Sequence, residues 1–84
     1  MAEIENLEKF NATILSTTRS MLKLANTEKQ KEAIIKRTIQ AQEKELKAIK
    51  GSTEADERKR QAIRKNISQI QKMGEEFNLS LIHI

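Results

Sequence analysis

The sequence predicts an all-α fold: an antiparallel helical hairpin (about 28–50 and 54–73), preceded by a helix at about 3–25, in a three-helix bundle or coiled coil. Apolar residues recur at steps of three and four, and no stretch alternates as a strand does. The chain is rich in Lys, Glu, Gln and Ala, which favour helix, and it has no Pro. These observations together indicate helices joined by short turns.

The first helix carries one continuous row with the spacing of a helix–helix seam. We expect this row to face the other two helices. Its members are Leu7, Phe10, Ile14, Thr17, Met21 and Leu24.

The second helix is predicted to begin after Thr27 as N-cap, with Gln30 as the partner in a capping box. Its seam residues are Ile35, Ile39, Gln42 and Leu46. Gln42 is polar within this row, which allows two interpretations. A buried amide can fix the register or oligomeric state of packed helices. Alternatively, the row is loosely packed and Gln42 reaches water.

Gly51 is predicted to end the second helix as its C′ residue, and Ser52 or Thr53 to cap the third helix. The third seam row comprises Ile63, Ile67 and Ile70. A hairpin turn near residue 52 would place Ile35 opposite Ile70 and Gln42 opposite Ile63. Gly74 either ends the third helix or lies inside a helix that runs to Phe77.

The composition limits the protein to one small domain with a thin core. The 84 residues are 37% hydrophobic and 33% charged. So short a chain is only marginally stable alone, and we therefore expect self-association or binding to another helical protein. No stretch approaches the roughly 20 apolar residues that span a membrane. We expect neither a membrane nor a small molecule as a partner.

One stretch of the third helix is a possible basic patch, and it raises an alternative function. A nucleic-acid-binding protein neutralises phosphates with such side chains. However, the acidic stretch EADE precedes the patch, and no aromatic residue is available there to stack on bases. We therefore favour a solvated face, with a small basic nucleic-acid-binding protein as the alternative. The patch comprises Arg58, Lys59, Arg60, Arg64 and Lys65.

The residue types that catalysis needs are scarce, so we predict that the chain is not an enzyme. Cysteine is absent, and the single histidine, His83, lies in the closing LSLIHI. We expect no catalytic residue, cofactor or metal. The opening MAEIENLEKF has no basic start and no apolar run, so it is not a secretory signal. A cytoplasmic location or a place in a virion is expected.

Two resemblances extend this interpretation. Residues 79–84, LSLIHI, resemble the translation of a transposon end used as a sequencing adapter. The resemblance implies that 79–84 are a non-native tail and that 1–78 are the N-terminal part of a longer protein. The stretch TEKQKEAIIKRTIQAQEKELKAIKG resembles the helical segments of phage tail tape-measure and related virion proteins. It implies a structural role and assigns no function to any residue.

The function predicted from the sequence is therefore that of a structural or protein-interaction helical segment. Its mechanism would be the burial of apolar seams between helices, with charged outer faces in water.

Overall fold

The chain forms three α-helices, which confirms the predicted fold class. The computed structural model describes the backbone of residues 2–77 and the side chains of residues 5–77. Its helices are α1 (Ala2–Leu24), α2 (Glu28–Ala48) and α3 (Glu54–Glu76). The predicted boundary at residue 78 and the predicted non-native tail 79–84 lie outside this range.

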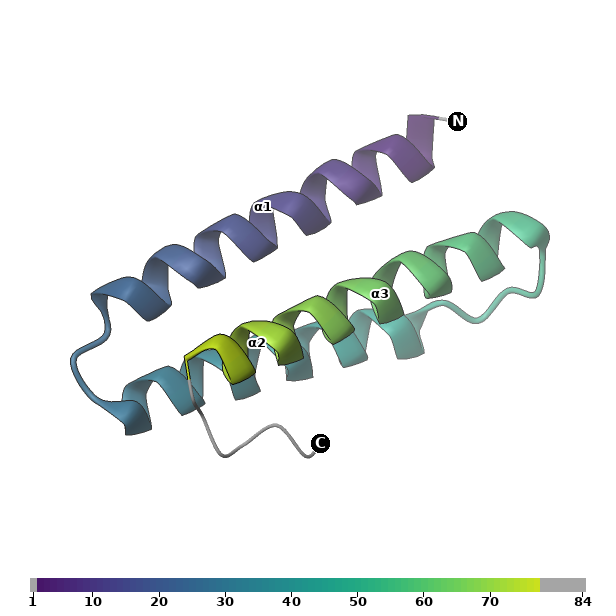
Figure 1. The fold of residues 1–84 in the computed structure, drawn as a ribbon. Coiled ribbons are helices and arrows are strands. Elements are labelled where there is room, and N and C mark those ends of the chain that lie inside the picture. Colours follow the sequence, from purple (N-terminus) through teal and green to yellow (C-terminus); the bar gives the residue numbers. More distant parts are fainter. Residues whose placement is uncertain (1, 78–84) are drawn as a thin grey trace.

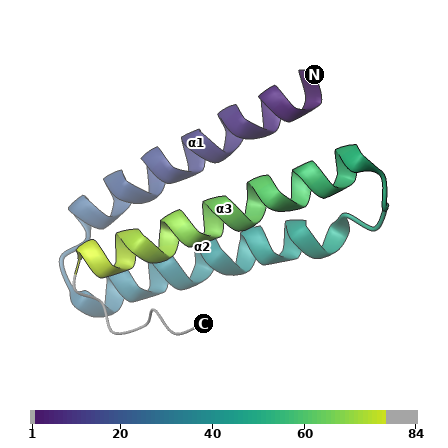
Figure 2. The same ribbon diagram turned by 45° about the vertical axis from the view of Figure 1, so that its right-hand side comes forward.

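The helices run up, down and up, so that each is antiparallel to the next. Figures 1 and 2 show α2 and α3 side by side as the predicted hairpin, with α1 lying along both of them. The N-terminal end of α1 lies at the same end of the bundle as the α2–α3 connection. Short connections between neighbouring helices favour this topology.

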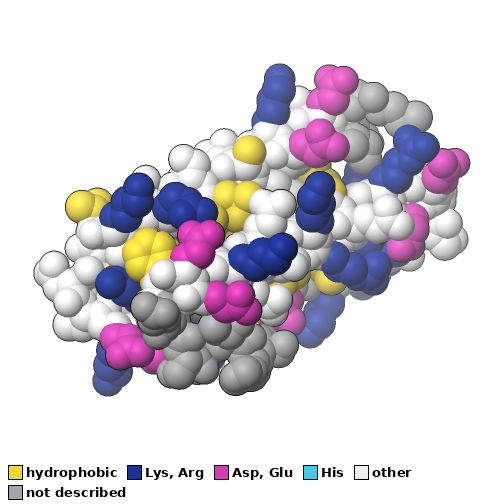
Figure 3. Space-filling model, viewed as in Figure 1, with side chains coloured by type: hydrophobic (Ala, Val, Ile, Leu, Met, Phe, Trp, Pro, Cys, Tyr) yellow, Lys and Arg dark blue, Asp and Glu magenta, His cyan; other side chains and the backbone are white. Residues whose placement is uncertain are grey.

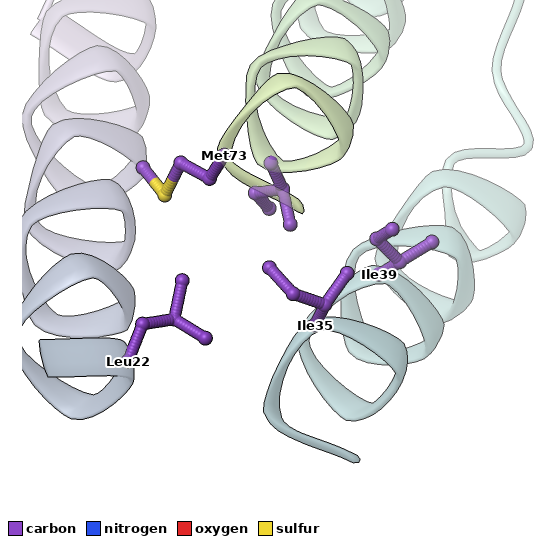
Figure 4. Close-up of a cluster of buried hydrophobic side chains, with 5 residues drawn as sticks. Leu22, Ile35, Ile39 and Met73 are labelled. Carbon is purple, nitrogen blue, oxygen red and sulfur yellow. The ribbon is translucent and has the colours of Figure 1, made fainter. Parts of the chain in front are cut away.

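The core is a small apolar cluster to which all three helices contribute. Leu22 of α1, Ile35 and Ile39 of α2, and Ile70 and Met73 of α3 are all buried. Figure 4 shows the side chains of Leu22, Ile35, Ile39 and Met73 pointing toward one another from their three helices. Burial of such side chains is the main favourable term that holds the helices together.

The seam row predicted for α1 is wrong for most of its members, because α1 is rotated relative to the expectation; of this row, Ile14 still packs against the core cluster. Phe10, Met21 and Leu24 are 51%, 48% and 79% exposed. Their neighbours Asn11 and Thr18 are buried instead, as is Leu22 of the core cluster. Thr18 satisfies its hydroxyl locally by donating to the carbonyl of Ile14 at 2.6 Å. A small polar residue whose hydrogen bond is made within its own helix can therefore face the core at little cost.

The beginning of α2 is capped as predicted, with one difference. Thr27 is the N-cap, and its side-chain oxygen accepts from the backbone N–H of Gln30 at 3.1 Å. The Gln30 side chain accepts from the backbone N–H of Asn26 at 2.9 Å, not from that of Thr27. Both bonds satisfy backbone groups that a helix terminus would leave unpaired.

The α2–α3 connection differs from the predicted glycine cap. Helix α2 ends at Ala48, and its C-cap is Ile49 in an extended conformation. Gly51 lies further along the loop, where a Cβ would come within 2.7 Å of the Asp56 Cγ. A side chain at this position would have to displace the Asp56 carboxylate, which accepts from the backbone N–H of Thr53.

The beginning of α3 has a complete capping box, and this settles the predicted choice of cap in favour of Thr53. The Thr53 hydroxyl accepts from the backbone N–H of Asp56 at 3.2 Å, and the Asp56 carboxylate accepts from the backbone N–H of Thr53 at 3.3 Å. Hydrogen bonds from the side chain and then the backbone of Thr53 lower the pKa of Asp56 from its usual 3.8.

The end of α3 settles the two interpretations of Gly74. The helix continues through Gly74, which is buried, to Glu76. The predicted end at residue 73 is therefore too early. Two contacts join this end of α3 to the other helices. The Arg19 guanidinium of α1 lies 2.8 Å from the Glu76 carboxylate. The Lys31 ammonium of α2 lies 5.4 Å from the centre of the Phe77 ring.

Candidate functional site

The predicted hairpin seam lies at the α2–α3 interface. Most residues of this seam are buried; they are Ile35, Ile39, Gln42, Ile63 and Ile70. Leu46 and Ile67 are only partly buried. Ile67 still packs against the core cluster. Asn66, beside it in the chain, takes the buried position. The seam is therefore a structural core rather than an accessible site.

Gln42 is buried in the seam, so the interpretation in which it reaches water is wrong. Gln42 and Asn66 are only 1% and 4% exposed, and the Asn66 Nδ2 donates to the Gln42 Oε1 at 2.8 Å. The partner lies almost one helical turn further along α3 than the predicted Ile63. A pair of buried amides constrains the register, since any other register would leave both unpaired.

A third buried amide lies beside this pair. Asn11 of α1 is 6% exposed, and its Nδ2 donates to the backbone carbonyl of Ala62 at 3.4 Å. Its Oδ1 has no hydrogen-bond partner among the described residues. Asn11 and Asn66 also line a hollow of about 350 Å³ between α1 and α3. The polar layer thus links α1 to the hairpin as well.

The predicted basic patch does not form one cationic surface. Arg58 is paired with Glu54 at 2.8 Å, and Arg64 lies 3.6 Å from Glu57. Lys65 lies in the hollow between α1 and α3, which Glu8 also lines. The charges of Arg58 and Arg64 are therefore partly compensated by carboxylates of the same helix.

Arg60, in the centre of the predicted patch, holds the loop together. Its side chain is only 18% exposed and pairs with Glu57 at 2.9 Å. The same guanidinium donates to the backbone carbonyl of Ile49 at 3.2 Å and to that of Gly51. Such charge-assisted bonds satisfy loop carbonyls. Arg60 is thus engaged in structure and is not free to bind a phosphate.

The candidate site is a groove between α1 and α2 that the sequence did not reveal. Two neighbouring hollows of about 390 and 450 Å³ between α1 and α2, which share Met21 and Arg37 in their linings, make up this site. We call it the α1/α2 groove and define it by its main apolar and small lining residues, which are Phe10, Thr17, Met21 and Leu24 of α1 with Ile34 and Ala41 of α2.

The α1 side of the groove is apolar or uncharged along most of its length. Phe10, Met21 and Leu24 are the large exposed hydrophobic side chains of the described residues. The stretch 10–18 of α1 contains no charged residue. By contrast, the face seen in Figure 3 has basic and acidic side chains interspersed, with hydrophobic side chains only in small patches. A contiguous apolar strip on one helix is typical of a protein-interaction surface.

One signal in the sequence points to this site. Helix α1 carries two apolar stripes, one through Phe10 and Met21 and a second through Leu15 and Leu22. Only one stripe can face the hairpin, so the other must lie at the surface or be covered by something else. The first stripe was the one predicted to face the core.

The described residues contain no group of three or more His, Cys, Asp or Glu side chains placed to hold a metal ion. Within residues 2–77, no helix combines the length and hydrophobicity that crossing a membrane requires. Comparison of the chain with protein-family models, curated proteins and solved structures finds no significant match.

Proposed function

We propose that this protein is a helical interaction module that binds a helix of a partner in the α1/α2 groove. The observation that carries the proposal is the position of Phe10, Met21 and Leu24, which line the groove while about half or more of each side chain is exposed. Covering the exposed part of each would contribute about 1 kcal/mol. An amphipathic helix with apolar residues at steps of three and four fits such a groove.

Nucleic-acid binding receives less support from the geometry. Arg58, Arg60 and Arg64 each lie beside a carboxylate, and Arg60 also binds loop carbonyls. A phosphate-binding site needs cations that are available to neutralise phosphates and so to release counterions from the nucleic acid. A place in a larger assembly such as a phage virion is part of our proposal, and it rests on the resemblance of the sequence alone.

A peptide titration of the full chain tests the proposal. The isotope-labelled protein is followed by NMR while a synthetic amphipathic helix with leucine at steps of three and four is added. We expect shift changes in Phe10, Met21 and Ile34, and their loss in a double variant with Phe10→Gln and Met21→Gln. The matched control is Ser68→Gln on the exposed surface of α3. Shift changes that avoid the groove, or persist in the double variant, would contradict the proposal.

A further inference from the structure

We propose that the partner in the α1/α2 groove is a second copy of this chain, whose α1 lies antiparallel to the first α1 about a two-fold axis. This inference rests on the proposed function and names its partner. Three features of the described helices lead to it: the order of apolar residues along α1, the distribution of charge along α1, and the shape of the groove.

The apolar row of α1 reads the same in both directions. Its steps are three, four, three, four and three from Leu7 to Leu24. A two-fold axis between Leu15 and Ser16 therefore places Leu7 against the Leu24 of the second copy, and Phe10 against its Met21. No polar residue larger than threonine falls on this row, because the central pair is Ile14 with Thr17. A row of this kind is self-complementary, as a two-fold interface requires.

The charges of α1 favour the antiparallel direction. Its N-terminal third contains three glutamates and one lysine, whereas its C-terminal third contains Arg19 and Lys23 and no acidic residue. Antiparallel packing opposes the two helix dipoles, and it brings the acidic end of one α1 to the end of the other that carries Lys23, whereas Arg19 is already paired with Glu76 of α3. Parallel packing would bring like charges together at both ends.

On the α1 side, the middle of the interface would bury no charge. Beside the row, Thr13 also lines the groove, and it is small and uncharged. The charged residues that line the groove are Arg37 and Glu45 of α2, one of each sign. Because few ions lose their hydration, the apolar contact is not cancelled by desolvation.

The area of the contact shows that α2 must take part. The 23 residues of α1 extend over about 35 Å, and a strip about 10 Å wide covers roughly 350 Å² on each copy. Specific interfaces bury roughly 1,200–2,000 Å² in total. The second α1 must therefore lie in the groove and contact α2 as well. Even so, the interface stays at the small end of that range, and we expect a dissociation constant in roughly the micromolar range.

Single cysteines test the register, because the native chain contains none. Thr17 lies close to the proposed axis, so Thr17→Cys should be joined to its own copy by a short bis-maleimide. The two Leu24 positions would lie about 25 Å apart along the helices, so Leu24→Cys should not be joined to itself. A mixture of Leu7→Cys and Leu24→Cys should give the mixed product. Ser68→Cys on α3 is the unlinked control.

Sedimentation of the full chain from micromolar to millimolar concentration measures the affinity. A two-fold dimer contains Met21 in both copies, so Met21→Gln should raise the dissociation constant on the order of thirtyfold. Ser68→Gln should leave the dissociation constant unchanged. Circular dichroism verifies that each variant keeps its helices.

Two results would overturn the inference. Equal linking of Thr17→Cys and Leu24→Cys would exclude the antiparallel register. A chain that stays monomeric and unlinked throughout would exclude the second copy. If the synthetic helix still binds the groove in that case, the proposed interaction module stands with a different partner. If the synthetic helix does not bind either, the proposed function fails as well.

Discussion

Replacement of Gln42 by leucine should destabilise the bundle, even though it adds an apolar side chain to the core. The Asn66 Nδ2 would lose its acceptor at 2.8 Å while remaining buried, with Asn66 only 4% exposed. A buried donor without a partner costs about 1–3 kcal/mol. The leucine recovers part of this by apolar burial, so we expect a net loss of about 1–2 kcal/mol. Asn66→Leu should give a similar loss for the same reason.

The double variant with Gln42→Leu and Asn66→Leu should behave differently. Both amides are then gone and neither leaves an unpaired group. We expect its stability within about 1 kcal/mol of the native chain, or above it. The double-mutant cycle should therefore give a coupling of about 2 kcal/mol.

Urea unfolding followed by far-UV circular dichroism measures all four proteins of the cycle. The matched control is Gln61→Leu, at an exposed position of α3, which should change the free energy of unfolding by less than about 0.5 kcal/mol. Single variants as stable as the native chain, with additive effects in the cycle, would refute the reasoning. They would show that Gln42 is paired with water and not with Asn66.

Three further predictions concern the core, a helix cap and the basic residues. Leu22 is fully buried, so Leu22→Ala should lower the free energy of unfolding by about 3 kcal/mol. Leu24 is 79% exposed, so Leu24→Ala should lower it by less than about 0.5 kcal/mol. Urea unfolding measures both variants. Because the folded pKa of Asp56 is lowered, its contribution is complete above its usual value of 3.8 and is lost as the pH falls through the folded value. The urea midpoints of the native chain and Asp56→Asn should therefore differ less at about pH 3 than at about pH 7. Finally, we expect no salt-sensitive binding to DNA or RNA in fluorescence anisotropy at low salt. If the chain does bind DNA or RNA, and if joint replacement of Arg58, Arg64 and Lys65 by glutamine abolishes that binding, the alternative function would be supported instead.

The sequence located the polar position in the seam but not its partner. A glutamine among isoleucines marks position 42 at once, and the spacing identifies its helix face. Which residue of α3 meets it depends on the length and path of the loop. Along that path the Arg60 guanidinium donates to the carbonyls of Ile49 and Gly51, and Gly51 lies against Asp56.

The roles of the individual residues in the possible basic patch could not be predicted, for a related reason. Arg58, Arg60 and Arg64 are close together in the sequence and lie on one helix, so they can be counted as a cluster. Their effective charge depends on side-chain pairing with Glu54 and Glu57, and in the case of Arg60 on the loop carbonyls. Pairing of this kind can be suggested by spacing, but only the folded loop shows that Arg60 is buried against it.

The sequence by itself determined the three helices of residues 2–77, where α2 and α3 begin, and which faces of α2 and α3 pack together. These properties depend on local hydrogen bonds and on periodic hydrophobicity, both of which are present in short stretches. The tertiary structure alone decided the rotation of α1. Both of its stripes are apolar enough to be buried, and the difference between them arises from contacts with the hairpin: Leu22 fits the core, while Asn11 and Thr18 find hydrogen bonds there. That choice leaves Phe10, Met21 and Leu24 at the surface, and so creates the groove.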